Sequence, residues 1–402
     1  MSEQAANAPP LQSITVVDLG QIYNGSYATF LMAMAGARVI KVEPPGGEHL
    51  RRRASVGGAA LPFAMLNSNK LSATLDLKTA RGRELLHSML QRADVVLENF
   101  APGTMDRLGL GWSVLKQVNP RLIYASGSGF GLSGPYRDYP AMDLTVQAMA
   151  GIMSITGFPD RPPVKAGPAM CDFSGGVHLY GAVMTTLFER SLTNRGRQVE
   201  VSMQEAVYTS LSSNLGLFLG DDKAAPARTG NRHGGLAESP YNVYSTKDGY
   251  IAIICVGETH WKSLIHAMER PELATDERFA NLAQRVANID AVDAIVGEFS
   301  ARFDKEALFQ LLMKNRVPCA PVRDLNEVIH DPHMLARRAL EWIDHPDLGK
   351  VPLPNSPMRF EGIEPLPIMP SRRLGQDNYK VYGEWLGLAP DAVAQLQSDG
   401  VI

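Results

Sequence analysis

Three carboxylates lie in one stretch near the middle of the chain that is rich in glycine and proline. Asp143, Asp160 and Asp172 each stand near turn-forming residues, where a scaffold can hold an acid at the edge of a cavity. A carboxylate in an apolar, water-poor surrounding can attack an acyl carbon and form a covalent intermediate that is protected from hydrolysis. The alternative is that all three are turn and cap residues, which is the common use of Asp in loops.

Basic residues near predicted turns suggest a binding site for an anion. Arg107 comes shortly after a predicted strand and the turn at residues 98–103, so it stands at the edge of a sheet where a phosphate group would dock. In the run Arg51 to Arg53, Arg52 and Arg53 are interpreted as part of a solvated face. The formal net charge of -3 gives no general attraction to nucleic acid or to an anionic membrane, so an anionic ligand must meet local basic groups.

Other catalytic patterns are weak. Residues 129–134 match G-x-G-x-x-G, but Pro135 and Pro140 favour a turn over the helix that a dinucleotide site needs. A glycine-lined passage beside a ligand is the better interpretation, because glycine allows close backbone approach. His330 and His333 lie in a Pro-containing loop, which does not favour a metal site.

The cysteines and the isolated histidines do not indicate a disulfide, a metal site or an acid–base catalyst. Cys171, Cys255 and Cys319 lie far apart without C-x-x-C spacing, so neither a disulfide framework nor a zinc site is indicated. A reducing cytoplasm is therefore the expected location. His49 is isolated in the sequence, and no acid–base role can be assigned to it.

Strand and helix patterns alternate through the first half of the chain. This alternation predicts a mostly parallel sheet with helices on both faces, whose ligands sit at the carboxyl ends of the strands. The expected strands are residues 14–19, 38–43, 94–98, 122–125 and 197–202, and the expected helices are residues 26–35, 80–92, about 114–118 and about 175–192.

The length of 402 residues suggests two domains. We expect a large α/β domain whose amino-terminal part is residues 11–220, a linker and small domain at 221–327, and a proline-rich return to the large domain at 328–402 that travels over a surface. The first ten residues are interpreted as a loose tail. No apolar run is long enough to span a membrane.

Many segments, in order, resemble one known family, the class III CoA-transferases. This family includes the formyl-CoA:oxalate and carnitine CoA-transferases, and the α-methylacyl-CoA racemases are its relatives. The similarity runs from about residue 11 to the end of the chain, through residues 17–46, 67–70, 75–78, 93–103, 108–110, 119–124, 128–131, 134–136, 147–148, 156–157, 196–202 and 374–402.

The resemblance implies a Rossmann-like large domain, a smaller α+β domain and an interlaced homodimer. It implies acyl-CoA and a small carboxylic acid as substrates, with no permanently bound cofactor or metal. The family's nucleophilic aspartate falls by position on Asp160. The CoA contacts fall by similarity on Tyr23, Asn24, Leu75, Asp76, Leu77, Lys78, Asn99, Phe100 and Arg107, with Ser128 standing where the formyl-specific members have a lysine.

Two other departures from the formyl-specific pattern are visible. Pro44 stands where those members have an arginine, and their glycine-rich lid is reduced to residues 233–235. Formyl and oxalate are therefore doubtful as substrates, and so is lid closure.

The resemblance suggests a CoA-transferase that works through an acyl-aspartyl anhydride and an aspartyl-CoA thioester, with a dicarboxylate such as succinate as one acceptor. Two alternatives stay open. A racemase would need a histidine directly before Asp143, where Met142 stands and cannot transfer a proton, and Asp172 would be its other partner by position. A catalytically silent acyl-CoA binding protein is the second alternative, against which the retained Asp160 speaks.

Overall fold

The computed structural model describes residues 8–52, 61–220 and 226–402. Most of the expected amino-terminal tail, Arg53 and the start of the expected linker at 221–225 lie outside these residues. The chain forms two compact units. Unit 1 consists of Met1–Val146, Pro168–Val207 and Ile329–Ile402, and unit 2 of Gln147–Gly167 and Tyr208–Val328. Residues 147–167 and 208–220, which the sequence assigned to the large domain, thus belong to unit 2.

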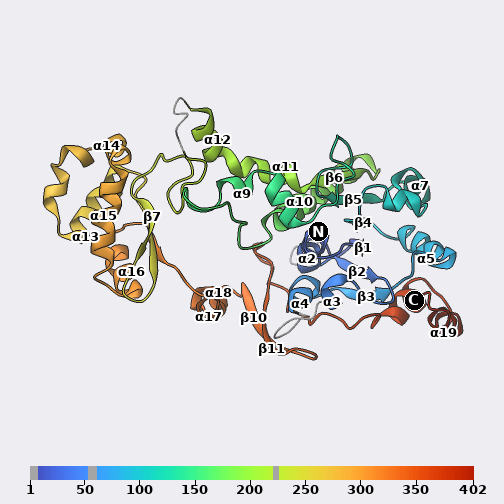
Figure 1. The fold of residues 1–402 in the computed structure, drawn as a ribbon. Coiled ribbons are helices and arrows are strands. Elements are labelled where there is room, and N and C mark those ends of the chain that lie inside the picture. The colour runs from blue at the N-terminus through green and yellow to red at the C-terminus, as the bar shows by residue number, and fades with distance from the viewer. Residues whose placement is uncertain (1–7, 53–60, 221–225) are drawn as a thin grey trace. The chain divides into compact units, whose positions relative to one another are not determined.

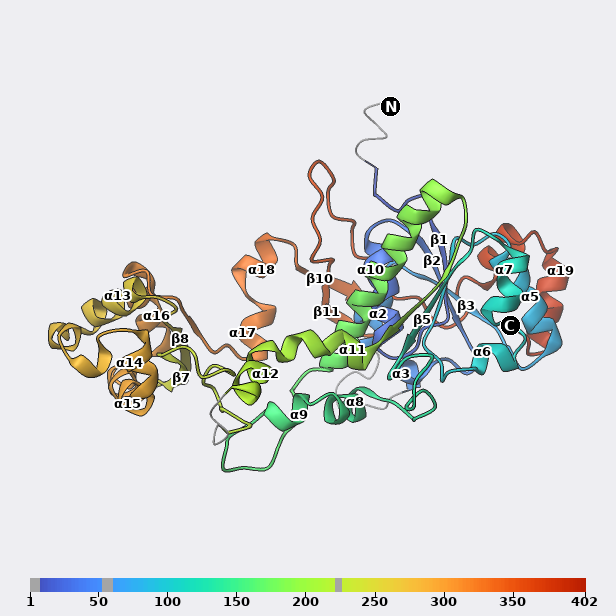
Figure 2. The ribbon, with the colours of Figure 1, turned by 90° about the horizontal axis from the view of Figure 1, so that it is seen from above.

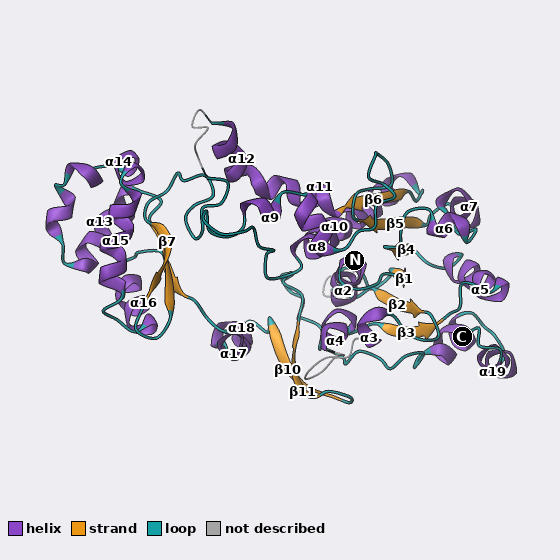
Figure 3. Ribbon diagram, in the orientation of Figure 1, coloured by secondary structure: helices purple, strands orange, loops and turns teal. Residues whose placement is uncertain are grey.

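Unit 1 is built on a six-stranded sheet in which every neighbouring pair is parallel. The predicted α/β fold is confirmed (Figures 1 and 3). The order β3-β2-β1-β4-β5-β6 reverses between β1 and β4, and such a reversal opens a crevice at the carboxyl ends of the strands. The strands are β1 (Thr15–Asp18), β2 (Arg38–Glu43), β3 (Leu71–Thr74), β4 (Val95–Glu98), β5 (Ile123–Ser128) and β6 (Gln198–Ser202).

Helices cover both faces of this sheet because side chains along the strands alternate between two apolar layers. In β1, Val16 belongs to the layer under α2 (Asn24–Met34) and α10 (Met170–Thr193), whereas Val17 belongs to the opposite layer. That opposite layer is covered by α5 (Ala80–Leu90), α7 (Trp112–Val118), the π-helix η4 (Tyr379–Trp385) and α19 (Pro390–Ser398). Figure 2 shows the two sets of helices on either side of the sheet.

The carboxyl-terminal return completes the core of unit 1. Val381, Tyr382, Val393 and Leu396 are buried against the sheet layer that also holds Leu85, whereas the prolines predicted a segment travelling over the surface. The return also carries an antiparallel hairpin, β10 (Leu340–His345) and β11 (Gly349–Pro354). The other helices of unit 1 are α3 (His49–Arg52), α4 (Leu61–Asn67), α6 (Thr104–Arg107) and α18 (Pro332–Ala336). Three more helices lie at its boundaries, namely α8 (Asp143–Met149), α11 (Met203–Tyr208) and α17 (Leu325–Ile329).

Unit 2 has an antiparallel sheet in the order β7-β8-β9 and its own apolar core. Its strands are β7 (Tyr241–Ser245), β8 (Tyr250–Ile254) and β9 (Cys319–Pro321), and its helices are α9 (Ile152–Ile155), α12 (Ser212–Leu219), α13 (Glu258–Met268), α14 (Leu282–Ala287), α15 (Ile289–Ser300) and α16 (Lys305–Lys314), with the 3-10 turns η1 (Thr209–Leu211), η2 (Pro271–Ala274) and η3 (Glu277–Phe279). Among the described helices of the whole chain, none is both long and apolar enough to cross a membrane.

Candidate active site

A cavity of about 610 Å³ lies where the strand order of unit 1 reverses. Its walls come from the segments after β1, β4 and β5, which meet at the carboxyl edge of the sheet. His49, Arg107 and Arg137 contribute basic groups, and Asp138 and Asp172 contribute acids. This is the position at which an open parallel sheet binds its ligand.

The structure brings five of the predicted CoA contacts together in this cavity. They are Asn24, Asn99, Phe100, Arg107 and Ser128. The other predicted contacts, Tyr23, Leu75, Asp76, Leu77 and Lys78, are not among its lining residues.

Those remaining residues lie close to the same edge of the sheet. Tyr23 stacks on Phe173 of α10, with ring centroids 5.6 Å apart. Leu75 directly follows β3 and is buried in the core, and the Asp76 side chain accepts a hydrogen bond from the Lys78 backbone N–H at 2.9 Å. Leu77 is partly buried against the same core, so Leu75 and Leu77 both have structural roles.

A network of buried charged side chains holds the loop between β1 and α2 in place. Lys70 Nζ donates to Asp18 Oδ2 at 3.0 Å and to Thr29 Oγ1 at 2.8 Å, while Asp18 Oδ1 accepts the Gly20 N–H at 2.8 Å. Lys41 Nζ donates to the Gly20 carbonyl. Burial lowers the pKa of Lys70 to about 8. Burial alone would raise the pKa of Asp18, but Lys41 and Lys70 hold it below its ordinary value.

Asn99 holds the same loop through two further hydrogen bonds. Its Oδ1 accepts the Gln21 N–H at 2.7 Å, and its Nδ2 donates to the Gln21 carbonyl at 2.9 Å. Ile22 has a φ of 58°, a left-handed conformation that is costly for a β-branched residue, and its N–H donates to Glu48 Oε2 at 3.1 Å. Asn99 therefore fixes the shape of this loop, which lines the cavity.

Asp172 is the carboxylate that shares the cavity with the predicted CoA contacts. It lies in the first turn of α10 and is 9% exposed. Asp143 Oδ1 accepts the backbone N–H groups of Cys171 at 2.8 Å and of Asp172 at 3.2 Å. Asp143 thus caps the start of α10 and holds Asp172 in place.

Asp160, the nucleophile expected from the sequence, is in a different setting. It belongs to unit 2, its side chain is 76% exposed, and its Oδ2 lies 3.6 Å from Arg161 Nε. The five predicted CoA contacts that line the cavity all belong to unit 1. The structure therefore unites these contacts with Asp172, an acid that the sequence left without a role in transfer.

Close helix packing explains how α10 reaches this position. A β-carbon added to Gly175 would lie 2.3 Å from Asn24 Nδ2, and one added to Gly176 would lie 2.7 Å from the Asn24 carbonyl oxygen. Only glycine at both positions lets α10 approach the start of α2 so closely. Residues Asp172 and Gly175 lie three apart on α10 and so on one face of the helix, which places Asn24 near the Asp172 carboxylate.

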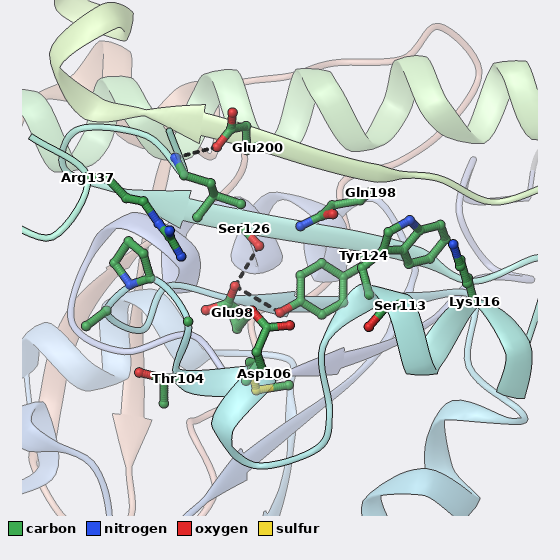
Figure 4. Close-up of a pocket in the computed structure, with 16 residues that line it drawn as sticks. Glu98, Thr104, Asp106, Ser113, Lys116, Tyr124, Ser126, Arg137, Gln198 and Glu200 are labelled. Atoms are coloured by element: carbon green, nitrogen blue, oxygen red, sulfur yellow. Dashed lines mark hydrogen bonds between the residues drawn. The ribbon is translucent and has the colours of Figure 1, made fainter. Parts of the chain in front are cut away.

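A second cavity of about 580 Å³ lies against β4, β5 and β6 and shares Ala101, Pro102 and Arg137 with the first. Figure 4 shows the hydroxyls of Ser126 and Tyr124 directed at the Glu98 carboxylate, at 2.6 and 3.3 Å. Burial raises the pKa of Glu98. This polar cavity was not anticipated from the sequence, because its side chains come from three strands far apart in the chain.

Comparisons with known proteins identify the family of the chain. The sequence profile of CoA-transferase family III matches residues 11–378. The chain is 35% identical to a formyl-CoA:oxalate CoA-transferase of Streptomyces avermitilis, over 98% of this chain and 99% of that protein. It is 38% identical to an acetyl-CoA:oxalate CoA-transferase of Acetobacter aceti, over 88% of this chain and 90% of that protein.

A solved structure extends the similarity to the fold. The crystal structure of a CaiB/BaiF family protein from Brucella suis has a TM-score of 0.81 and 34% identity, over 93% of this chain and 99% of that one. The resemblance inferred from the motifs is thereby confirmed. The chain belongs to CoA-transferase family III, and it is a CoA-transferase.

Proposed function

We propose that this enzyme moves CoA from an acyl-CoA thioester to a free carboxylic acid through covalent intermediates on Asp172. One observation carries the proposal: Asp172 lines the cavity at the strand-order reversal together with Asn24, Asn99 and Arg107. Asp160 is the alternative nucleophile, supported by its position after the Thr156–Gly157 pair in the sequence.

The reaction exchanges one acyl bond for another at each step. The aspartyl oxygen attacks the thioester carbonyl, the C–S bond breaks, and an acyl-aspartyl anhydride and CoA thiolate result. The thiolate then attacks the aspartyl carbonyl and releases the donor acid, which leaves an aspartyl-CoA thioester. The acceptor carboxylate attacks this thioester to form a new anhydride and thiolate. Attack of the thiolate on the acceptor's acyl carbon releases the new acyl-CoA and restores the carboxylate.

The acceptor is proposed to be a short dicarboxylate, with succinate as the first to test. Two relatives are named for oxalate, which is itself a dicarboxylate, another is named as a succinate–glutarate CoA-transferase, and the cavity carries a basic group at His49. A racemase finds no support in this cavity, because its wall holds Met142, a thioether that cannot transfer a proton.

Trapping experiments test the covalent step. Enzyme incubated with acyl-CoA and then treated with hydroxylamine or borohydride should carry a modified aspartate, which peptide mass spectrometry should locate at Asp172. Modification at Asp160 instead would show that the sequence-based assignment was right. Turnover without any trapped aspartate would remove the covalent mechanism.

The cap on α10 gives a second prediction. Asp143→Ala removes the acceptor for two backbone N–H groups, so we expect a loss of about 1 kcal/mol in the free energy of unfolding and about a tenfold fall in kcat from misplacement of Asp172. Asp331→Ala is the control, because Asp331 likewise accepts two backbone N–H groups, at the start of α18, and does not line this cavity. A normal kcat in Asp143→Ala would show that the cap is only structural.

The interlaced homodimer and the cytoplasmic location are also part of the proposal. Phe188, Leu192, Phe218 and Leu219 are between 68% and 80% exposed in the isolated chain, and apolar side chains exposed to this degree are typical of surfaces that a partner covers. The three cysteines are free thiols, which fits a reducing compartment. Light scattering should give the mass of a dimer, and a monomer would contradict the interlaced assembly.

A further inference from the structure

Two arginine side chains converge on one glycine at the rim of the active-site cavity. A β-carbon added to Gly103 would lie 3.3 Å from Arg107 Nη1 and 3.7 Å from Arg137 Nη2. Gly103 has a φ of +77°, a conformation that favours glycine. We infer that Arg137 is a second residue that binds the phosphates of CoA. It acts together with Arg107, and both guanidinium groups lie beside Gly103, which carries no side chain. The inference rests on the proposed placement of CoA in the cavity.

The charges of the two guanidinium groups are only weakly compensated by the contacts found. Arg107 donates to the neutral Thr104 Oγ1 at 2.8 Å. Arg137 Nε lies 3.8 Å from Asp138 Oδ1, and both side chains are exposed, at 44% and 81%, so this ion pair is worth little. Two like charges held close together repel each other unless an anion lies between them. A phosphate group supplies that charge and matches the forked donors of arginine.

The loop that carries Arg137 is well anchored. The Leu132 N–H donates to Glu200 Oε2 on β6 at 2.6 Å. The rings of Tyr136 and Tyr139 stack at 5.0 Å, and Phe130 packs edge-on against both. Figure 4 shows Arg137 reaching into the second cavity from this loop. The backbone that carries Arg137 is therefore fixed near the rim before any ligand arrives, which lowers the entropic cost of binding.

Arg137 also lies where an extended ligand would pass. It lines both cavities, together with Ala101 and Pro102. CoA is a long molecule whose phosphates lie far from its thioester. With the thioester near Asp172, its phosphates would reach the rim formed by Arg107 and Arg137. This role was not predicted from the sequence, because Arg137 lies in the proline-containing turn after the glycine-rich segment.

Steady-state kinetics with two thioesters test the inference. One substrate is the acyl-CoA, and the other is the same acyl group on N-acetylcysteamine, which has the thioester but no phosphates. Arg137→Ala should raise KM for the acyl-CoA about 10- to 100-fold, the range for a charged hydrogen bond, and leave kcat/KM for the N-acetylcysteamine thioester unchanged. Arg137→Lys should recover only part of the loss, because a lysine cannot reproduce the forked donors.

Two further variants make the outcome decisive. Arg270→Ala is the matched control, because Arg270 is also 44% exposed and pairs with a nearby acid, Glu272, in unit 2. Arg107→Ala is the reference for phosphate binding. If Arg107→Ala raises KM and Arg137→Ala does not, the inference about Arg137 is overturned alone. If neither variant changes KM, the placement of CoA in this cavity is also wrong. Equal losses with both thioesters would show a structural defect and would likewise overturn the inference.

Discussion

Replacing Asp172 by asparagine is expected to lower kcat for CoA transfer by at least about a thousandfold, the scale found when a covalent nucleophile is removed. An amide at this position keeps the size of the side chain but cannot accept the acyl group. The fold should be preserved, because Asp143 caps α10 through the backbone N–H of residue 172, which the substitution does not change. The measurement is initial-rate transfer between an acyl-CoA and succinate, with binding of CoA measured separately.

Asp160→Asn is the matched control, because it makes the same chemical change in the aspartate that the sequence favoured. We expect its rate to stay within about twofold of the unmodified enzyme, since Asp160 is largely exposed and surface substitutions usually have small effects. The reverse result, a large loss in Asp160→Asn and none in Asp172→Asn, would establish Asp160 as the nucleophile. Full activity in both variants would exclude the aspartyl mechanism.

Replacing Lys70 by methionine should destabilise unit 1 by about 3–5 kcal/mol, the cost of leaving a buried charge unpaired. Lys70 and Asp18 are both buried, and Lys70 Nζ makes hydrogen bonds to Asp18, Thr29, Asn67 and the Ser26 carbonyl. Without Lys70, Asp18 keeps its charge only with help from Lys41. Urea unfolding followed by circular dichroism measures the change in the free energy of unfolding.

The double variant Asp18→Asn, Lys70→Met separates the charge effect from lost packing. It removes both members of the pair, so most of the stability should return, because exchanging a whole buried ion pair costs far less than breaking it. A double variant as unstable as Lys70→Met would assign the loss to packing and to the other hydrogen bonds of Lys70. A cost below about 1 kcal/mol in Lys70→Met would contradict the structural role of the pair.

The sheet of unit 1 was largely predictable, because each β-α-β repeat carries a local pattern. Residues 38–43 were predicted as a strand and form β2 with the same bounds. The edge strand β3 (Leu71–Thr74) was missed, since its apolar and polar residues alternate over only 4 positions, which is the shortest run that such a pattern can identify. The hairpin β10–β11 was missed because Pro352 and Pro354 lie in β11, and proline usually argues against a strand.

The lining of the cavity was partly predictable, but the aspartate within it was not. The predicted CoA contacts that line the cavity follow strands, so the sheet topology brings them together. The position of Asp172 depends on where α10 begins. Gly175 and Gly176 marked the expected start of that helix, whereas it begins at Met170 and continues through both glycines. Their close contact with Asn24 involves residues far apart in the chain, so the sequence pattern could not reveal that Asp172 opens a helix beside the cavity.

The discontinuous course of unit 1 has a consequence for biosynthesis. Its first 146 residues leave the ribosome long before Ile329–Ile402, which supplies Val381, Tyr382 and Leu396 to the same core. Until residues 379–398 have been synthesised, one apolar face of the nascent sheet has no helix η4 or α19 to cover it. Such a surface promotes aggregation, so we expect the nascent sheet to need shielding until these two helices have formed.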